Sequence, residues 1–128
     1  MKAILDTHTF LWWCIDHPEL SLPAREVIAD GRNEIFFSAV CAWEIMIKVQ
    51  IGRLTLPDHP ELFINNQVTD NQFSQLPMTT AHALGLTQLS SIHKDPFDRI
   101  LVAQAKIEKL PLISSDKTLA KYGVEVIW

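Results

Sequence analysis

The sequence predicts an α/β fold, with a central parallel sheet of about five strands and helices on both of its faces. Short apolar runs alternate along the chain with helical segments of about ten residues, and such alternation is typical of parallel βαβ units. The length of 128 residues is that of one domain with one core, and no internal repeat or linker divides it. We therefore expect a single domain over residues 1–128.

Five short apolar segments are the predicted strands. Residues 2–6 (KAILD) and 34–37 (EIFF) are the clearest, because each is a brief apolar run of the kind that forms a buried strand. The three weaker segments are residues 73–76, 112–114 and 124–128. In a parallel sheet of this kind, ligands bind outside the carboxyl ends of the strands, so a functional site is expected at that edge.

The helices are predicted from the residues at their ends. Ser38 is a favourable N-cap for a helix over residues 39–51, which Gly52 closes. Asp95 and Pro96 begin a helix over residues 96–109. The remaining predicted helices cover residues 7–15, 22–30, 58–68, 80–89 and 117–122.

Composition narrows the class of protein. A hydrophobic fraction of 48% is too high for a disordered chain, and no apolar stretch is long enough for a membrane span. The beginning MKAILDTH leaves no room for a signal peptide, so we expect a cytoplasmic protein. Cys14 and Cys41 lie in apolar segments without a CxxC motif and are interpreted as reduced core residues. The net charge of −4 lacks the basic excess of a passive nucleic-acid binder, unless cations mask some of the acids.

Several acids are expected at the carboxyl edge of the sheet. Asp6 ends the first predicted strand and Asp116 follows the fourth in the same way, although each could simply cap the next helix. Asp98 lies in the first turn of its helix, at the head of a core-facing line. Asp95 is interpreted first as the N-cap of that helix, and whether it also reaches a metal is left open.

Glu44 shares one face of its predicted helix with Val40, Ile47 and Ile51. A charge on a core-facing stripe is costly unless it is paired or binds a metal. A second apolar stripe runs down the opposite side, at Ala42, Ile45 and Val49. If the second stripe faces the core, Glu44 is simply solvated; we favour the buried position.

Carboxylates that crowd together repel one another, unless a divalent cation neutralises them. A donor set of oxygens, without cysteine or a compact histidine pair, suits Mg²⁺ or Mn²⁺ rather than zinc. Such a site is suited to phosphodiester hydrolysis, because the ion lowers the pKa of an attacking water. The acids that make the net charge negative would then hold the cations that attract phosphate.

Four stretches of the chain resemble the successive motifs of the PIN-domain ribonucleases, and most closely those of VapC-type toxins from bacterial toxin–antitoxin pairs: ILDTHTFLWW, SAVCAWEI, HKDPFDRILVAQA and LISSDKTLAKYGVEVIW. The likeness extends over residues 2–128. It implies a PIN-like domain that acts as a Mg²⁺-dependent endoribonuclease, with an RNA substrate, a second copy of itself in a homodimer and a cognate antitoxin as partners. By this resemblance the metal-binding and catalytic residues are Asp6, Glu44, Asp98 and Asp116, with Ser115 as the hydroxyl before the last acid.

Basic, aromatic and histidine residues near these acids are weaker candidates. Arg99, next to Asp98, is the preferred residue for holding the RNA backbone. Further basic candidates are Lys48, Arg53, Lys94 and Lys117. The indoles of Trp12, Trp13 and Trp43 could stack on RNA bases, but we favour packing within the protein. His8 and His93 lie near the expected site, and we favour solvated loop positions for both.

Two other functions are compatible with the predicted fold. A phosphoryl-acceptor receiver domain also uses acids at strand ends, but it normally has an adjacent acid pair after the first strand, where this chain has only Asp6. A non-catalytic binding module is disfavoured because all four acids are present. A phosphatase of the D-x-D type is excluded, since residues 6–8 are Asp-Thr-His.

Overall fold

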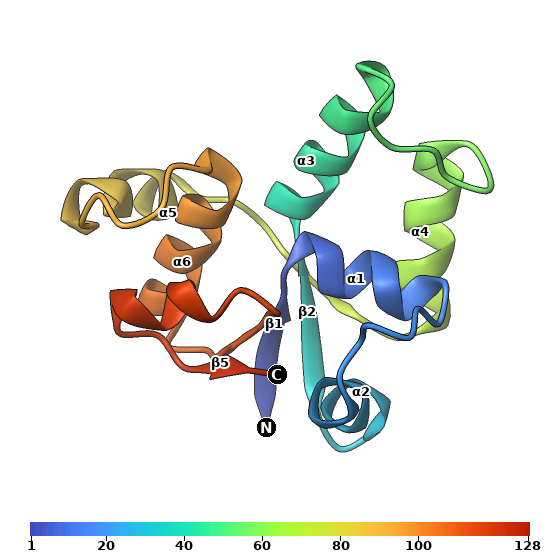
Figure 1. Ribbon diagram of the computed structural model, residues 1–128, viewed down its shortest axis with the longest axis horizontal. Helices are drawn as coiled ribbons and strands as arrows, with labels where there is room; N and C mark the ends of the chain where they lie inside the picture. Colours follow the sequence, from blue (N-terminus) through green and yellow to red (C-terminus); the bar gives the residue numbers. More distant parts are fainter.

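The computed structural model describes residues 1–128, and a five-stranded parallel sheet forms its centre (Figure 1). The strands are β1 (Lys2–Leu5), β2 (Glu34–Ser38), β3 (Ser74–Leu76), β4 (Leu112–Ile113) and β5 (Val126–Ile127). They lie side by side in the order β3-β2-β1-β4-β5, and every neighbouring pair is parallel. The chain therefore reverses its direction of strand addition beside β1, where a ligand site is expected in such sheets.

Helices cover both faces of this sheet, as predicted. Figure 1 shows α1, α2 and α4 on one side and α5 and α6 on the other. The α-helices are α1 (Thr7–Cys14), α2 (Leu22–Ala29), α3 (Ala39–Gln50), α4 (Pro60–Asp70), α5 (Thr80–Leu84) and α6 (Pro96–Glu108). Two short 3₁₀ helices are η1 (Gly85–Gln88) and η2 (Lys117–Tyr122). None of the helices has the length and apolar character that a membrane span requires.

Some elements differ from the sequence-based expectation in extent or type. The helix predicted over residues 80–89 is α-helical only to Leu84 and then tightens into η1. Tightening of this kind is common at helix ends. The last strand was expected over residues 124–128, but it pairs only at Val126 and Ile127. Its partner β4 offers only Leu112 and Ile113, and this limits the length of the ladder.

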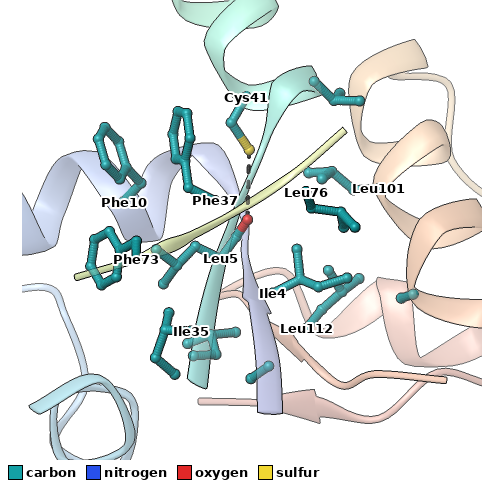
Figure 2. Packing of buried hydrophobic residues seen from close by; sticks show 14 of the residues in the cluster. Ile4, Leu5, Phe10, Ile35, Phe37, Cys41, Phe73, Leu76, Leu101 and Leu112 are labelled. Carbon is teal, nitrogen blue, oxygen red and sulfur yellow. Dashed lines mark hydrogen bonds between the residues drawn. The ribbon is translucent and has the colours of Figure 1, made fainter. Parts of the chain in front are cut away.

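The hydrophobic core lies in two layers, one on each face of the sheet. Successive residues of a strand point to opposite faces. Figure 2 accordingly shows Leu5 on the side of Phe10, Phe37 and Phe73, and Ile4 on the other side. The rings of Phe10 and Phe37 are in contact, with centroids 4.4 Å apart. This packing holds α1 against the sheet, directly after the strand that ends in the first predicted acid.

Both cysteines are free thiols, as predicted. Cys41 is fully buried, and its Sγ donates to the carbonyl oxygen of Leu5 at 3.6 Å (Figure 2). Burial raises the pKa of the Cys14 thiol to about 12, so this group stays protonated and unreactive near neutral pH.

A buried polar network fixes α6 relative to β2 and α3. Ser38 is the last residue of β2 and the N-cap of α3, where its hydroxyl accepts from the backbone N–H of Val40. The same hydroxyl donates to Oε1 of the buried Gln104 at 2.6 Å. Gln104 also donates to the carbonyl oxygen of Pro77 at 3.3 Å. Because α3 carries Glu44 and α6 carries Asp98, this network sets the relative position of two candidate site residues.

Candidate active site

Asp6 is buried at the carboxyl end of β1. Its backbone N–H donates to the carbonyl oxygen of Ile113 in β4, and its carboxylate caps α1 by accepting from the N–H of Thr9 at 2.8 Å. Burial raises the pKa of Asp6, although hydrogen bonds from Ser114 and Thr9 act in the opposite direction. The residue is therefore both a helix cap and a carboxyl group held in a poorly solvated position.

Glu44 is also buried, with 3% of the residue exposed, which confirms the favoured prediction. One carboxylate oxygen accepts from the hydroxyl of Thr7 at 2.6 Å, and the other pairs with the ammonium group of Lys48 one helical turn away. These two partners explain how a carboxylate is tolerated on the core side of α3.

The buried face of α3 includes parts of both predicted stripes. Val40 and Glu44 from one stripe and Ile45 from the other are buried, whereas Ile51 is 59% exposed. The stripe that carries Glu44 is therefore buried toward the beginning of α3 and exposed at the end of the helix. The reason is that α3 packs against α1, α4 and α6 near its beginning, while its last turn projects beyond them (Figure 1).

His93, Asp98 and Asp116 form a compact group. The Nε2 atom of His93 lies 2.9 Å from Oδ2 of Asp116 and 3.4 Å from Oδ2 of Asp98. Its Nδ1 atom accepts from the backbone N–H of Asp95 at 3.1 Å, so in the neutral ring the proton is on Nε2 and points to the two carboxylates. One ligand atom from each of the three residues lies within 4.8 Å of the others, which is close enough for one metal ion.

The pKa of Asp98 is affected by carboxylates from other parts of the sequence. The pKa of Asp98 is raised to about 7, mainly by burial and further by the nearby carboxylates of Asp95, Asp6 and Glu44, while His93 acts in the opposite direction. These acids come from three separate parts of the sequence. Their mutual influence therefore follows from the fold, which brings the carboxyl end of β1, the first half of α3 and the beginning of α6 to one edge.

The pKa of Asp116 is shifted in the opposite direction to that of Asp98. Burial raises the pKa of this carboxyl, but hydrogen bonds from Thr118 and His93 outweigh it and hold the pKa below its usual range. The hydroxyl of Thr118 donates at 2.6 Å and its N–H at 3.0 Å. Without a cation, the site therefore combines an ionised Asp116 with an Asp98 that readily holds a proton.

Asp95 is the N-cap of α6, as predicted. Its Oδ1 atom accepts from the N–H of Phe97 at 2.8 Å and from that of Asp98 at 3.3 Å. Because it also raises the pKa of Asp98, its carboxylate lies close to the site. A direct contact of Asp95 with a metal stays a prediction.

The side chains of the two residues expected to assist substrate binding make no hydrogen bond or ion pair with the carboxylates. Ser115 is exposed, whereas the buried Ser114 accepts from the N–H of Asp116 at 3.0 Å and hydrogen-bonds Asp6. The guanidinium of Arg99 donates to the carbonyl oxygen of Ser90 at 2.9 Å and so holds the loop before α6. RNA contacts by Ser115 and Arg99 stay predictions, and for Arg99 this loop contact competes with them.

The sequence did not predict the contacts that Ser114 and His93 make in the site. Ser114 could have been found from strand register: Leu5 pairs with Ile113, so the next residues along, Asp6 and Ser114, are neighbours. The interpretation of His93 as a solvated loop residue is wrong, because its ring bridges two carboxylates and is only partly exposed. No local sequence pattern signals this bridge, which depends on the path of the loop before α6.

The favoured interpretation of the tryptophans as packing residues agrees with their contacts. Trp13 donates from its indole nitrogen to Asn71 at 2.9 Å. Trp43 packs edge-on against Phe97, with ring centroids 4.9 Å apart, and half of the residue remains exposed.

The fold and this acidic edge define a known class of protein: the chain belongs to the PIN domain family, whose family model matches residues 3–125. Among curated proteins it is similar to Ribonuclease VapC16 of Mycobacterium tuberculosis, with 33% identity over 70 residues. That match covers 52% of this chain and 50% of the relative, so it spans about half the length of each.

Solved structures with low sequence identity share the fold. VapBC2 from Rickettsia felis, bound to a DNA fragment from their promoter, matches with a TM-score of 0.73 and 12% identity, over 98% of this chain and 97% of that chain. DNA-bound VapBC from Salmonella typhimurium matches with a TM-score of 0.70 and 17% identity, over 98% of this chain and 96% of that one. The predicted α/β fold of PIN type is thus confirmed.

The raised pKa of Asp98 leads to a prediction about stability in the presence of a chelator. The folded chain binds a proton at Asp98 up to about pH 7, whereas the usual value is 3.8. The free energy of unfolding should therefore fall as the pH rises from about 4 to about 7, since the folded state holds the extra proton in this window. Asp6 acts in the same direction. Urea unfolding in EDTA at several pH values measures the slope.

Asp98→Asn should remove a large part of this pH dependence and raise stability at neutral pH, because it removes a carboxylate that is repelled by its neighbours. Asp70→Asn, at an exposed position at the end of α4, is the matched control and should leave the slope unchanged. Equal slopes in the wild type and in Asp98→Asn would contradict the crowding of the acids.

A second prediction separates the two roles of Asp95. Asp95→Ala should lower the free energy of unfolding by about 0.5–2 kcal/mol, because the N-cap of α6 is lost. Asp95→Ser should be nearly neutral, since a serine hydroxyl can still accept from the first turn. Thermal melts and RNA-cleavage rates are measured on both. A well-folded Asp95→Ser protein with full activity limits Asp95 to capping, and a large loss of activity in that protein assigns it to the metal site.

Proposed function

We propose that the chain is a Mg²⁺-dependent endoribonuclease and the toxin of a type II toxin–antitoxin pair. The observation that carries this proposal is the convergence of Asp6, Glu44, Asp98 and Asp116 on one edge of the sheet, where burial and the neighbouring carboxylates together raise the pKa of Asp98 to about 7. Membership of the PIN domain family and similarity to a protein named as a ribonuclease support the choice of reaction and substrate.

The residues at this edge fit a hard divalent cation. Asp6, Glu44, Asp98 and Asp116 supply carboxylate oxygens, the donor type that Mg²⁺ and Mn²⁺ prefer, and Asp95 lies within reach. No thiol joins the group, because the free cysteines are Cys14 in α1 and the buried Cys41. A bound Mg²⁺ would neutralise the carboxylates, attract a phosphate and supply a water of lowered pKa for attack on phosphorus.

The surrounding side chains hold these carboxylates in fixed orientations. Thr7 and Lys48 bind the two oxygens of Glu44, and Thr9 and Ser114 hold Asp6. His93 acts as a positioning residue, since its Nε2–H contacts both Asp116 and Asp98. Fixed ligands of this kind do not have to reorganise when substrate binds, and this preorganisation favours catalysis.

An antitoxin and a second copy of the chain are the proposed protein partners. A hollow of about 440 Å³ lies between α3, α4 and β3, and its lining includes Phe37, Ala42, Ile64 and Val68. Trp43 of α3 and Leu62 of α4 are about half exposed, and so much apolar surface on a small domain is typical of a partner site. The solved structures of similar fold include VapBC complexes. The reduced cysteines are in keeping with action in the cytoplasm.

The nuclease proposal predicts RNA cleavage that depends on a divalent cation. Single-stranded RNA should be cut with Mg²⁺ or Mn²⁺ and not with EDTA, as followed by gel electrophoresis. Asp6→Asn, Glu44→Gln, Asp98→Asn and Asp116→Asn should each lower the rate by about 100-fold or more while the protein stays folded. Asp70→Asn is the matched control and should cleave normally. Cleavage that continues at the same rate in EDTA would rule out the metal mechanism.

The toxin proposal predicts growth arrest that requires the nuclease site. Induced wild-type protein should stop growth, Glu44→Gln should not, and Glu26→Gln, at an exposed position in α2, should behave as wild type. Co-expression of the cognate antitoxin should restore growth, and light scattering should give twice the chain mass of 14.6 kDa. If Glu44→Gln arrests growth as strongly as the wild type, the toxicity has another source.

A further inference from the structure

A second hollow, separate from the one between α3, α4 and β3, lies between α1 and the end of α3, close to Glu44. We call it the α1–α3 pocket. Its volume is about 460 Å³. This is within the range of about 300–1,000 Å³ that is usual for small-ligand sites. The function assigned above makes no use of it.

The α1–α3 pocket and the acidic site share a wall. Thr7 and Lys48 both line the pocket. Both also contact the carboxylate of Glu44, the threonine through its hydroxyl and the lysine through its ammonium group. A molecule in the pocket would therefore contact the two side chains that hold Glu44, which is one of the four acids of the proposed site.

The charged residues of the pocket have the opposite sign to those of the site. Lys48 and Arg53 are basic, and no acid lines the pocket. Arg53 is exposed, and its guanidinium makes neither a hydrogen bond nor an ion pair within the chain, so it is free to bind an external anion. In a chain of net charge −4, a local basic group beside a hydrolytic site favours a phosphate.

The rest of the lining is apolar and aromatic. Trp12 forms one wall, and its ring is held by stacking on His17 at 5.4 Å and by a tilted contact with Trp128 at 5.8 Å between centroids. Leu11, Ile15 and Leu54 are the aliphatic residues of the lining, His8 adds an imidazole ring, and Ile15 is 57% exposed. A fixed aromatic wall beside apolar side chains suits a nucleobase, which packs on such surfaces whatever its hydrogen-bonding edge.

We propose that the α1–α3 pocket binds one nucleotide of single-stranded RNA adjacent to the scissile phosphate, with the base against Trp12 and a flanking phosphate on Arg53. The proposal rests on the ribonuclease function proposed above and adds the element that selects where the RNA is cut. With its base and its flanking phosphate both held in the pocket, this nucleotide would fix the register of the strand relative to the acidic site.

Binding of a labelled short single-stranded RNA of mixed sequence, measured by fluorescence anisotropy, tests this proposal. The background is Asp98→Asn in Mg²⁺, so that the RNA is not cut. Ile15→Glu places a carboxylate at the exposed rim and should weaken binding about tenfold, the equivalent of 1.4 kcal/mol. Arg53→Gln should reduce the slope of log K against log salt by about 0.7, the amount expected for one lost phosphate contact on a single strand.

Lys2→Gln is the matched control, because it removes the same charge at the amino end of β1, the far end of the sheet. It should change neither the affinity nor the slope. Unchanged binding and slope in both Ile15→Glu and Arg53→Gln would overturn the proposal. Variants that bind RNA normally but no longer bind the antitoxin would also overturn it, since the pocket would then be a protein-binding site. If the pocket variants lose RNA binding while the wild type cuts no RNA, the pocket stands and the nuclease proposal fails.

Discussion

Like charges at the carboxyl edge of the sheet repel one another, and much of the chain serves to keep them together. The cost is visible at Asp98, whose pKa of about 7 reflects burial and the carboxylates around it. Specific donors reduce the repulsion: Thr7 and Lys48 bind the carboxylate of Glu44, and His93 contacts those of Asp98 and Asp116. Carboxylates arranged in this way are incompletely neutralised by the protein itself, which is the physical basis of the cation binding that we propose.

The arrangement depends on elements that are themselves firmly held. Asp6 follows a strand that is buried between β2 and β4, and its backbone is tied to Ile113. The helices that carry Glu44 and Asp98 are joined through the buried pair Ser38 and Gln104. Site and core are thus parts of one structure, and a change in the packing of α6 would alter the distances between acids that are remote in the sequence.

Local patterns were sufficient to predict the fold and to expect several acids at the carboxyl edge of the sheet, whereas the roles of these acids stay a prediction. Strand ends, helix caps and helical faces are encoded over a few residues, and parallel pairing then places Asp6, Asp98 and Asp116 at one edge. Glu44 was harder to place, because both faces of α3 are apolar and the choice depends on how many neighbours the helix has. The sequence favoured the correct side but could not show that both stripes contribute to the buried face.

The parts of the site that the sequence did not predict depend on distance in three dimensions. Ser114, rather than Ser115, contacts the carboxylate of Asp6 because of the register between β1 and β4, a property of two strands that local pattern does not define. Arg99 was chosen for its proximity to Asp98 in sequence, yet its side chain extends to Ser90. The bridge made by His93 likewise depends on the conformation of the loop before α6.

The outer strands of the sheet, β3 and β5, are only three and two residues long. An exposed strand offers unpaired N–H and C=O groups to other chains, and longer edges are templates for aggregation. With such short edges, little backbone is available for a foreign strand to pair with. Folded copies of the chain can therefore reach a high local concentration with a reduced tendency to aggregate through their sheet edges.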